Sequence, residues 1–112
     1  MQGAGLEGIR YDRLCRTSNS EAYLISRADE AIGRIDLHFT TSTVYGLLIV
    51  EREMPHEELT ALIGRIDEDL VWSADVIRDD FVVTVYQGYE VGVFSESESS
   101  RGDVDAEDGE SG

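Results

Sequence analysis

The clearest pattern along the chain is a strict alternation of apolar and polar residues in the segment 34–40. Ile35, Leu37 and Phe39 occupy every second position, and charged or polar residues separate them. Because successive side chains of a β-strand point to opposite sides of the sheet, this pattern predicts a strand with one buried face. The other face is expected to be wet or to contact polar groups.

Three neighbouring segments extend this strand pattern. Residues 22–26 are a compact apolar run with aromatic and β-branched members, which predicts a strand, and residues 29–33 have the composition of a turn. Residues 43–50 are apolar at both odd and even positions, which is typical of a central strand covered on both sides. Residues 11–16 alternate imperfectly and fit either a short edge strand or a helical turn.

A helix is predicted over residues 55–70. Pro55 suits the first helical position, because its φ is already helical and its missing N–H has no partner there. Glu57 and Glu58 follow and favour the positive end of the helix dipole. The apolar residues recur at the spacing of one helical face: Leu59, Leu62, Ile63, Ile66 and Leu70.

The last ordered unit is predicted to be a β-hairpin. Residues 81–86 and 89–94 are rich in valine and aromatic residues, and the dipeptide Gln87-Gly88 lies between them. Glycine in a two-residue connection suits the positive φ angles of hairpin turns. This hairpin would place Tyr86 opposite Tyr89.

The predicted fold class is therefore α+β: an antiparallel sheet of about five strands in the order β-β-β-α-β-β, with one amphipathic helix packed on one face. We expect a single domain over residues 1–94, with residues 1–10 loose. Residues 95–112 hold seven acids against one arginine, a charge of −6, and one large aliphatic residue. This segment is predicted to be a disordered acidic tail.

Net charge excludes more classes of function than any sequence motif does. The formal charge is −15, of which −9 belongs to residues 1–94, and all nine basic residues are arginine. Such a charge disfavours direct binding to nucleic acid or to anionic lipid. The all-arginine composition fits a GC-rich genome or adaptation to high salt, and the acidity itself fits either that adaptation or mimicry of nucleic acid.

Counting apolar faces suggests a second copy of the chain. One helix can cover one face of the sheet, whereas the segment 43–50 and the closing hairpin are apolar on both faces. Either the N-terminal segment around Tyr11 and Leu14 folds across the other face, or a second copy covers it and forms a homodimer. The predicted interface residues are Tyr45, Tyr86, Tyr89 and Val91.

Candidate chemistry is sparse. Asp36 and His38 are two apart on one strand, so a carboxylate would lie beside an imidazole. Together with Trp72 they are the predicted ligand-binding residues, in a pocket between the helix 55–70 and the sheet. We assign no catalytic residue, no metal site and no cofactor, because no further group of a recognised spacing accompanies them.

Location and function follow as expectations. The lone Cys15 cannot form an intrachain disulfide, no apolar run reaches membrane-spanning length, and the first residues lack the pattern of a signal peptide. A cytoplasmic location without membrane contact is expected. The leading hypothesis is a small acidic, non-enzymatic protein-binding or regulatory module that self-associates through its sheet. The alternatives are a small-ligand-binding protein or minor enzyme, and an acidic nucleic-acid mimic.

Overall fold

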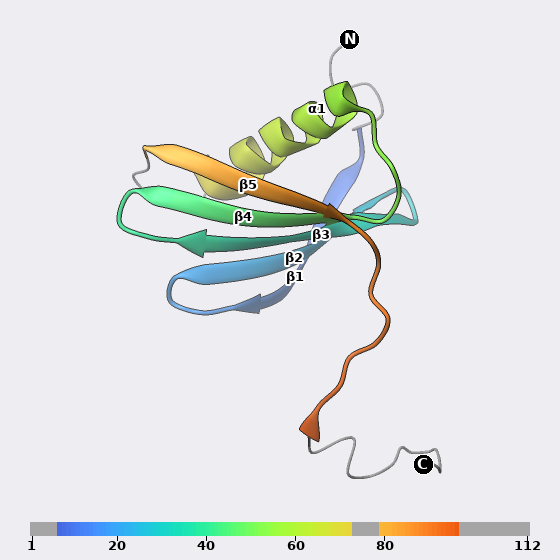
Figure 1. Ribbon diagram of the computed structural model, residues 1–112, viewed down its shortest axis with the longest axis horizontal. Coiled ribbons are helices and arrows are strands. Elements are labelled where there is room, and N and C mark those ends of the chain that lie inside the picture. The colour runs from blue at the N-terminus through green and yellow to red at the C-terminus, as the bar shows by residue number, and fades with distance from the viewer. Residues whose placement is uncertain (1–6, 73–78, 97–112) are drawn as a thin grey trace.

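The computed structural model describes residues 7–72 and 79–96 of the chain and contains a five-stranded sheet and one helix (Figure 1). The α+β class is as predicted. The elements in chain order are β1 (Ile9–Arg16), β2 (Ser20–Arg27), β3 (Glu30–Phe39), β4 (Thr43–Val50), α1 (His56–Ile66), its π-helical continuation η1 (Asp67–Val71) and β5 (Asp80–Gln87).

The sheet follows the chain order, β1-β2-β3-β4-β5. The first four strands form an antiparallel meander, whereas β5 pairs with β4 in parallel. Helix α1 lies between these two strands in the sequence, and a connection of that length is what parallel neighbours require. The observed order is β-β-β-β-α-β, so the predicted order β-β-β-α-β-β is corrected. The undecided segment 11–16 belongs to the edge strand β1.

The predicted closing hairpin is wrong in its second half. Residues 81–86 lie in β5, but residues 89–94 form no strand, and Tyr86 has no partner at Tyr89. The N–H of Gly88 donates to the carbonyl oxygen of Val50 at 2.9 Å, which continues the β4–β5 pairing past the end of β5. Among the described glycines only Gly8 has a positive φ, so the hairpin turn expected at Gly88 is not made.

The connection between β2 and β3 is tighter than the sequence suggested. β3 already begins at Glu30, so most of the predicted turn 29–33 is strand, and the turn itself lies at residues 28–29. Ala28 adopts a left-handed conformation there, with φ 56°. Ile25 pairs with Gly33 and Ser26 with Ala31, so the ladder carries a bulge that leaves one extra residue in β3.

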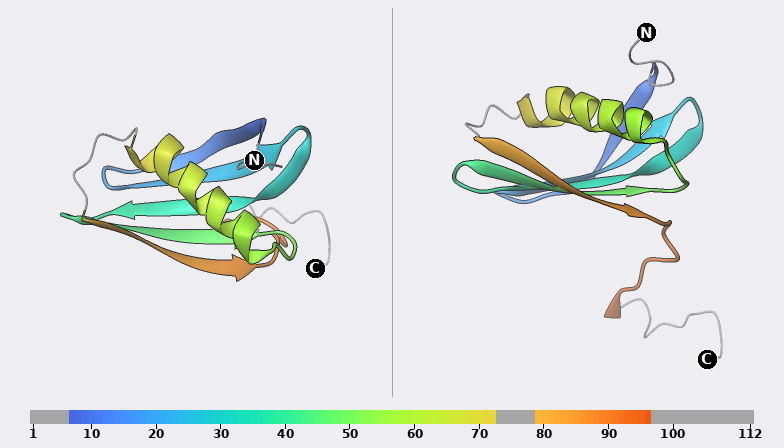
Figure 2. Two further views of the ribbon diagram at one scale, coloured as in Figure 1. Left: turned by 90° about the horizontal axis from the view of Figure 1, so that it is seen from above. Right: turned by 45° about the horizontal axis from the view of Figure 1, so that its top comes forward.

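Helix α1 lies on one side of the sheet, and the core forms between them (Figure 2). The prediction that Ile35 and Leu37 point to the buried face is confirmed, since both are fully buried. Pro55 precedes the helix as its N-cap residue and is not its first residue. The buried cluster comprises Tyr23, Ile25, Ile35, Leu37, Val44, Leu48, Val50, Leu62, Ile66, Leu70 and Val71.

Strand β1 is tied to the end of the helical segment. The Tyr11 hydroxyl donates to Oδ2 of Asp69 at 2.8 Å, and Arg65 Nε lies 3.3 Å from the same oxygen. Burial, reinforced by the hydrogen bond to Asp69, raises the pKa of Tyr11 well above its usual value. Tyr11 therefore packs against the core, and the segment around it does not fold across the opposite face of the sheet.

Two predicted segments lie largely outside the described residues. Of the predicted tail 95–112, only Ser95 and Glu96 are described, and of the predicted loose start 1–10, residues 1–6 lie outside, whereas β1 begins at Ile9. In the described part of the chain, no helix has the length and apolar character needed to cross a membrane.

Candidate binding surface

The side of the sheet turned away from α1 exposes several large apolar side chains, and we call it the open face. It is formed by the residues of β2 to β5 that alternate with those facing α1, and Ala22 is the one of them that is itself buried. Strand register places these side chains in adjacent rows. The open face comprises Ala22, Leu24, Arg34, Asp36, His38, Tyr45, Leu47, Ile49, Val82, Thr84 and Tyr86.

Large apolar side chains of the open face remain accessible. Leu24 is 41% exposed, Tyr45 49% and Tyr86 58%. Leu47 and Ile49 between them are partly buried by their neighbours. The prediction that strand 43–50 is covered on both sides is therefore wrong for a single chain, because only the parity of Val44, Leu48 and Val50 is buried.

Polar residues border this apolar strip on β3. Arg34 Nε donates to Oδ1 of Asp36 at 2.8 Å. This hydrogen bond is the main reason why the pKa of Arg34 is raised above its usual value. His38 is exposed and lies directly across from Tyr45 of β4. The border thus offers one ion pair and one imidazole beside aromatic rings.

The predicted ligand-binding residues are not brought together. Asp36 and His38 share the open face, as their spacing indicated. Trp72 directly follows η1, whose helix lies on the other side of the sheet (Figure 2). These three residues therefore do not line one pocket between helix and sheet.

The predicted interface residues fall into two groups. Tyr45 and Tyr86 lie on the open face. Tyr89 and Val91 belong to residues 88–94, which leave the sheet after β5 and which we call the arm. The arm runs away from the sheet on the side opposite α1 (Figures 1 and 2).

A groove separates the first part of the arm from the open face. Its volume is about 430 Å³. Leu24, Arg34, Asp36 and Ile49 line it from the sheet, and the lining residues from the arm are Gly88, Tyr89, Glu90, Gly92 and Val93. The arm therefore passes near its own open face without closing over it.

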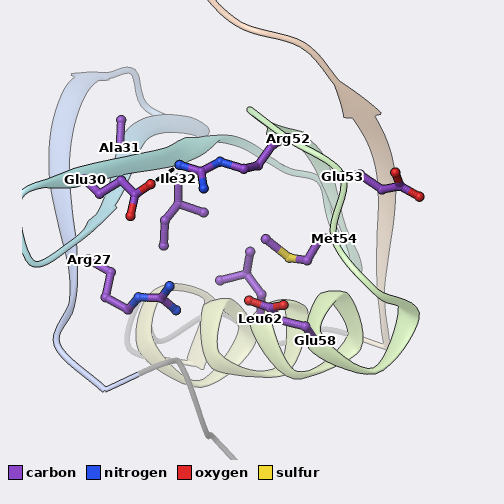
Figure 3. Close-up of a pocket in the computed structure, with 9 residues that line it drawn as sticks. All are labelled: Arg27, Glu30, Ala31, Ile32, Arg52, Glu53, Met54, Glu58 and Leu62. Carbon is purple, nitrogen blue, oxygen red and sulfur yellow. Dashed lines mark hydrogen bonds and ion pairs between the residues drawn. The ribbon is translucent and has the colours of Figure 1, made fainter.

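A second, smaller cavity of about 180 Å³ lies where the β2–β3 hairpin meets the start of α1, and we call it the hairpin cavity. Figure 3 shows Ile32, Met54 and Leu62 pointing toward its middle, and Arg27 reaching in from the hairpin. Arg52 forms an ion pair with Glu30 at its rim. Among the described residues Arg27 makes no ion pair, so its charge remains available.

Sequence reasoning missed the hairpin cavity because its residues come from three separate segments. Arg27 and Arg52 are 25 positions apart and carry no motif. The β2–β3 turn and the end of β4 bring them to one side of α1. The only sequence signal for this cavity is that one arginine ends β2 and another follows β4, and this signal is weak.

The remaining candidate metal-binding and reactive side chains do not form a site in the described residues. Within residues 7–72 and 79–96, no group of three or more His, Cys, Asp or Glu is positioned to hold a metal ion. His56 is exposed at the start of α1, and Cys15 is exposed on β1. Comparison of the chain with protein-family models, with curated proteins and with solved structures finds no match.

Proposed function

We propose that this chain is a small protein-binding module that acts without catalysis and self-associates through the open face of its sheet. The observation that carries the proposal is the row of exposed apolar side chains on that face, on the side away from α1. An exposed apolar surface with polar neighbours is typical of an interaction site. Tyrosine in particular is enriched in protein interfaces.

The energetics favour covering this face. Apolar surface contributes about 25 cal/mol per Å² when it leaves water. Leu24, Tyr45 and Tyr86 each remain at least two-fifths exposed, so a partner that covers them gains several contributions of this kind. A two-fold axis through the open face would place the same surface of each copy against the other, which is the commonest symmetry of homodimers.

The double variant Tyr45→Glu/Tyr86→Glu tests the proposal. Two carboxylates would have to enter the interface without partners, and the loss of two aromatic contacts adds to that penalty. We expect self-association at least about 100-fold weaker than in the wild-type chain. Sedimentation equilibrium over a wide range of protein concentration measures this change.

The variant Thr60→Glu/Gly64→Glu is the matched control, because it adds the same charge on the exposed side of α1. Its association should equal that of the wild-type chain. A wild-type chain that sediments as a monomer at every concentration would contradict the proposal. Equal weakening by both variants would show that net charge, and not the open face, governs association.

A second candidate function is favoured by the hairpin cavity. Within the described residues Arg27 makes no ion pair, and it lies beside the apolar side chains of Ile32, Met54 and Leu62 in a lining that also holds the carboxylates of Glu53 and Glu58. This combination fits a small carboxylate with a short apolar chain, whose charge pairs with the guanidinium while its hydrocarbon part is buried. The volume of about 180 Å³ limits the ligand to a few carbon atoms.

Titration with butyrate tests this second function. Butyrate is expected to shift the NMR signals of Ile32 and Leu62 at millimolar concentration, and Arg27→Gln should abolish these shifts. Arg16→Gln, at an exposed arginine on β1, is the control and should leave them unchanged. Equal shifts with butanol, or none with butyrate, would refute a carboxylate site.

A further inference from the structure

We infer that the arm of one copy packs against the open face of a second copy, so that the two chains exchange arms across a two-fold axis. This inference rests on the self-association proposed above and specifies its geometry. It assigns a role to residues 89–94, which form no strand in their own chain. The occupant of the open face is then a defined segment of the same protein.

The first observation is the composition and exposure of the arm. Tyr89, Val91, Val93 and Phe94 have the apolar character of a buried strand. All four are nevertheless 74% to 88% exposed. No other described segment of the chain exposes so many large apolar side chains in so few residues. Covering such a segment with a complementary apolar surface lowers the free energy, because apolar side chains leave water.

The second observation is the direction of the arm. Its start is fixed, because Gly88 donates to the carbonyl oxygen of Val50 and so extends the parallel pairing of β5 with β4. From there the chain continues on the side of the sheet where the open face lies (Figure 1). The exposed apolar residues of the arm and those of the open face thus lie on the same side of the sheet. A single two-fold related copy on that side can cover both.

The third observation is that the arm does not cover its own sheet. The groove of about 430 Å³ stays between them. Val91 and Phe94 remain among the most exposed apolar residues of the described chain. The groove is therefore open to a segment that comes from outside, and the arm of the second copy is apolar and extended enough to enter it.

Charge supports the same arrangement. Asp36 is the main cause of the raised pKa of Arg34, and Glu90 of the arm in the same chain makes the smallest of the contributions. Glu90 and Arg34 both line the groove. This pairing lies within one chain; in an exchanged dimer, Glu90 of each arm would meet Arg34 of the other copy in its place, so the same opposite charges would still face each other.

The available surface is of the size that a stable dimer needs. A standard interface buries about 800 Å² on each partner. Eight large apolar residues of the open face and the arm are at least 41% exposed: Leu24, Tyr45, Val82, Tyr86, Tyr89, Val91, Val93 and Phe94. Their combined exposed area is on the order of 800 Å² per chain.

Isotope-filtered NMR on the full chain tests the inference. A mixture of ¹³C-labelled and unlabelled chains reports only contacts between different copies. We expect intermolecular NOEs from the methyl groups of Val91 and Val93 to those of Leu24 and Ile49, which line the groove. The variant Val91→Ser/Phe94→Ser should lose these NOEs and self-associate about 10-fold more weakly. Its melting temperature at high dilution should be unchanged, because both side chains are exposed in the single chain.

Leu14→Ser is the control, since it removes an exposed apolar side chain from β1, at the opposite edge of the sheet. It should leave association unchanged. NOEs from the arm to the open face of the same chain only would overturn the exchange. A dimer that keeps its strength in Val91→Ser/Phe94→Ser would also overturn it, while leaving self-association through the open face intact. A wild-type monomer would instead refute the proposed function itself.

Discussion

Replacing Gly33 with alanine is expected to destabilise the protein by about 3 kcal/mol or more. Gly33 lies inside the sheet, where it pairs with Ile25 on one side and Val50 on the other. A Cβ atom at this position would overlap the carbonyl oxygen of Ile49 and lie 3.0 Å from the Cα of Val50. Both obstacles are backbone atoms of β4, so the clash can be relieved only if the strands move apart. Urea denaturation followed by circular dichroism measures the loss.

Gly64→Ala provides the matched comparison. Gly64 lies in α1, is exposed, and has open space where its Cβ would be. Alanine is favoured over glycine inside a helix by about 0.5 to 1 kcal/mol, so this variant should be more stable than the wild type. If both alanine variants shifted stability in the same direction, this would contradict the close approach of the β4 backbone to Gly33.

Leu48→Ala is expected to cost about 2 to 5 kcal/mol of unfolding free energy. The Leu48 side chain is fully buried between the sheet and α1. Its removal loses apolar burial and leaves a cavity that the rigid meander cannot close. A domain of this size has a total stability of only about 5 to 15 kcal/mol, so this substitution removes a large part of the free energy of unfolding. Thermal and urea denaturation at low protein concentration measure the effect.

Leu24→Ala removes the same atoms from the open face. Because Leu24 is 41% exposed, we expect the cost at high dilution to be about 1 kcal/mol or less. At higher concentration the cost should grow, since the proposed self-association stabilises the folded chain by mass action. Similar losses for Leu24→Ala and Leu48→Ala at high dilution would show that the two faces of the sheet are equally buried in one chain.

Local periodicity was sufficient to predict most of the elements. The alternation around Ile35 and Leu37 identified both β3 and its buried face. The spacing of Leu62 and Ile66 identified α1 and the side that it buries. These features depend on the repeat of one helix or strand, and the hydrophobic effect enforces that repeat wherever one side faces a core.

Pairing could not be predicted in the same way. Residues 89–94 have a strand pattern, and Gly88 has the residue type of a hairpin turn, yet the chain continues the pairing of β5 with β4 instead. A pattern of this kind shows that a segment can be covered, and it does not show by which chain. The candidate surfaces were hidden for the same reason, because the open face and the hairpin cavity exist only once the register of four strands is fixed.

The parallel pairing of β4 and β5 separates the fold into an early and a late part. The meander β1 to β4 is held by contacts between neighbours in the sequence, whereas Thr43 of β4 must find Asp80 of β5 across the entire helical segment. Closing that long loop is the slow kind of step in folding, because its entropy cost precedes its contacts. We therefore expect strand β5 to join last. During synthesis the meander can assemble before the ribosome has released the residues that complete the sheet.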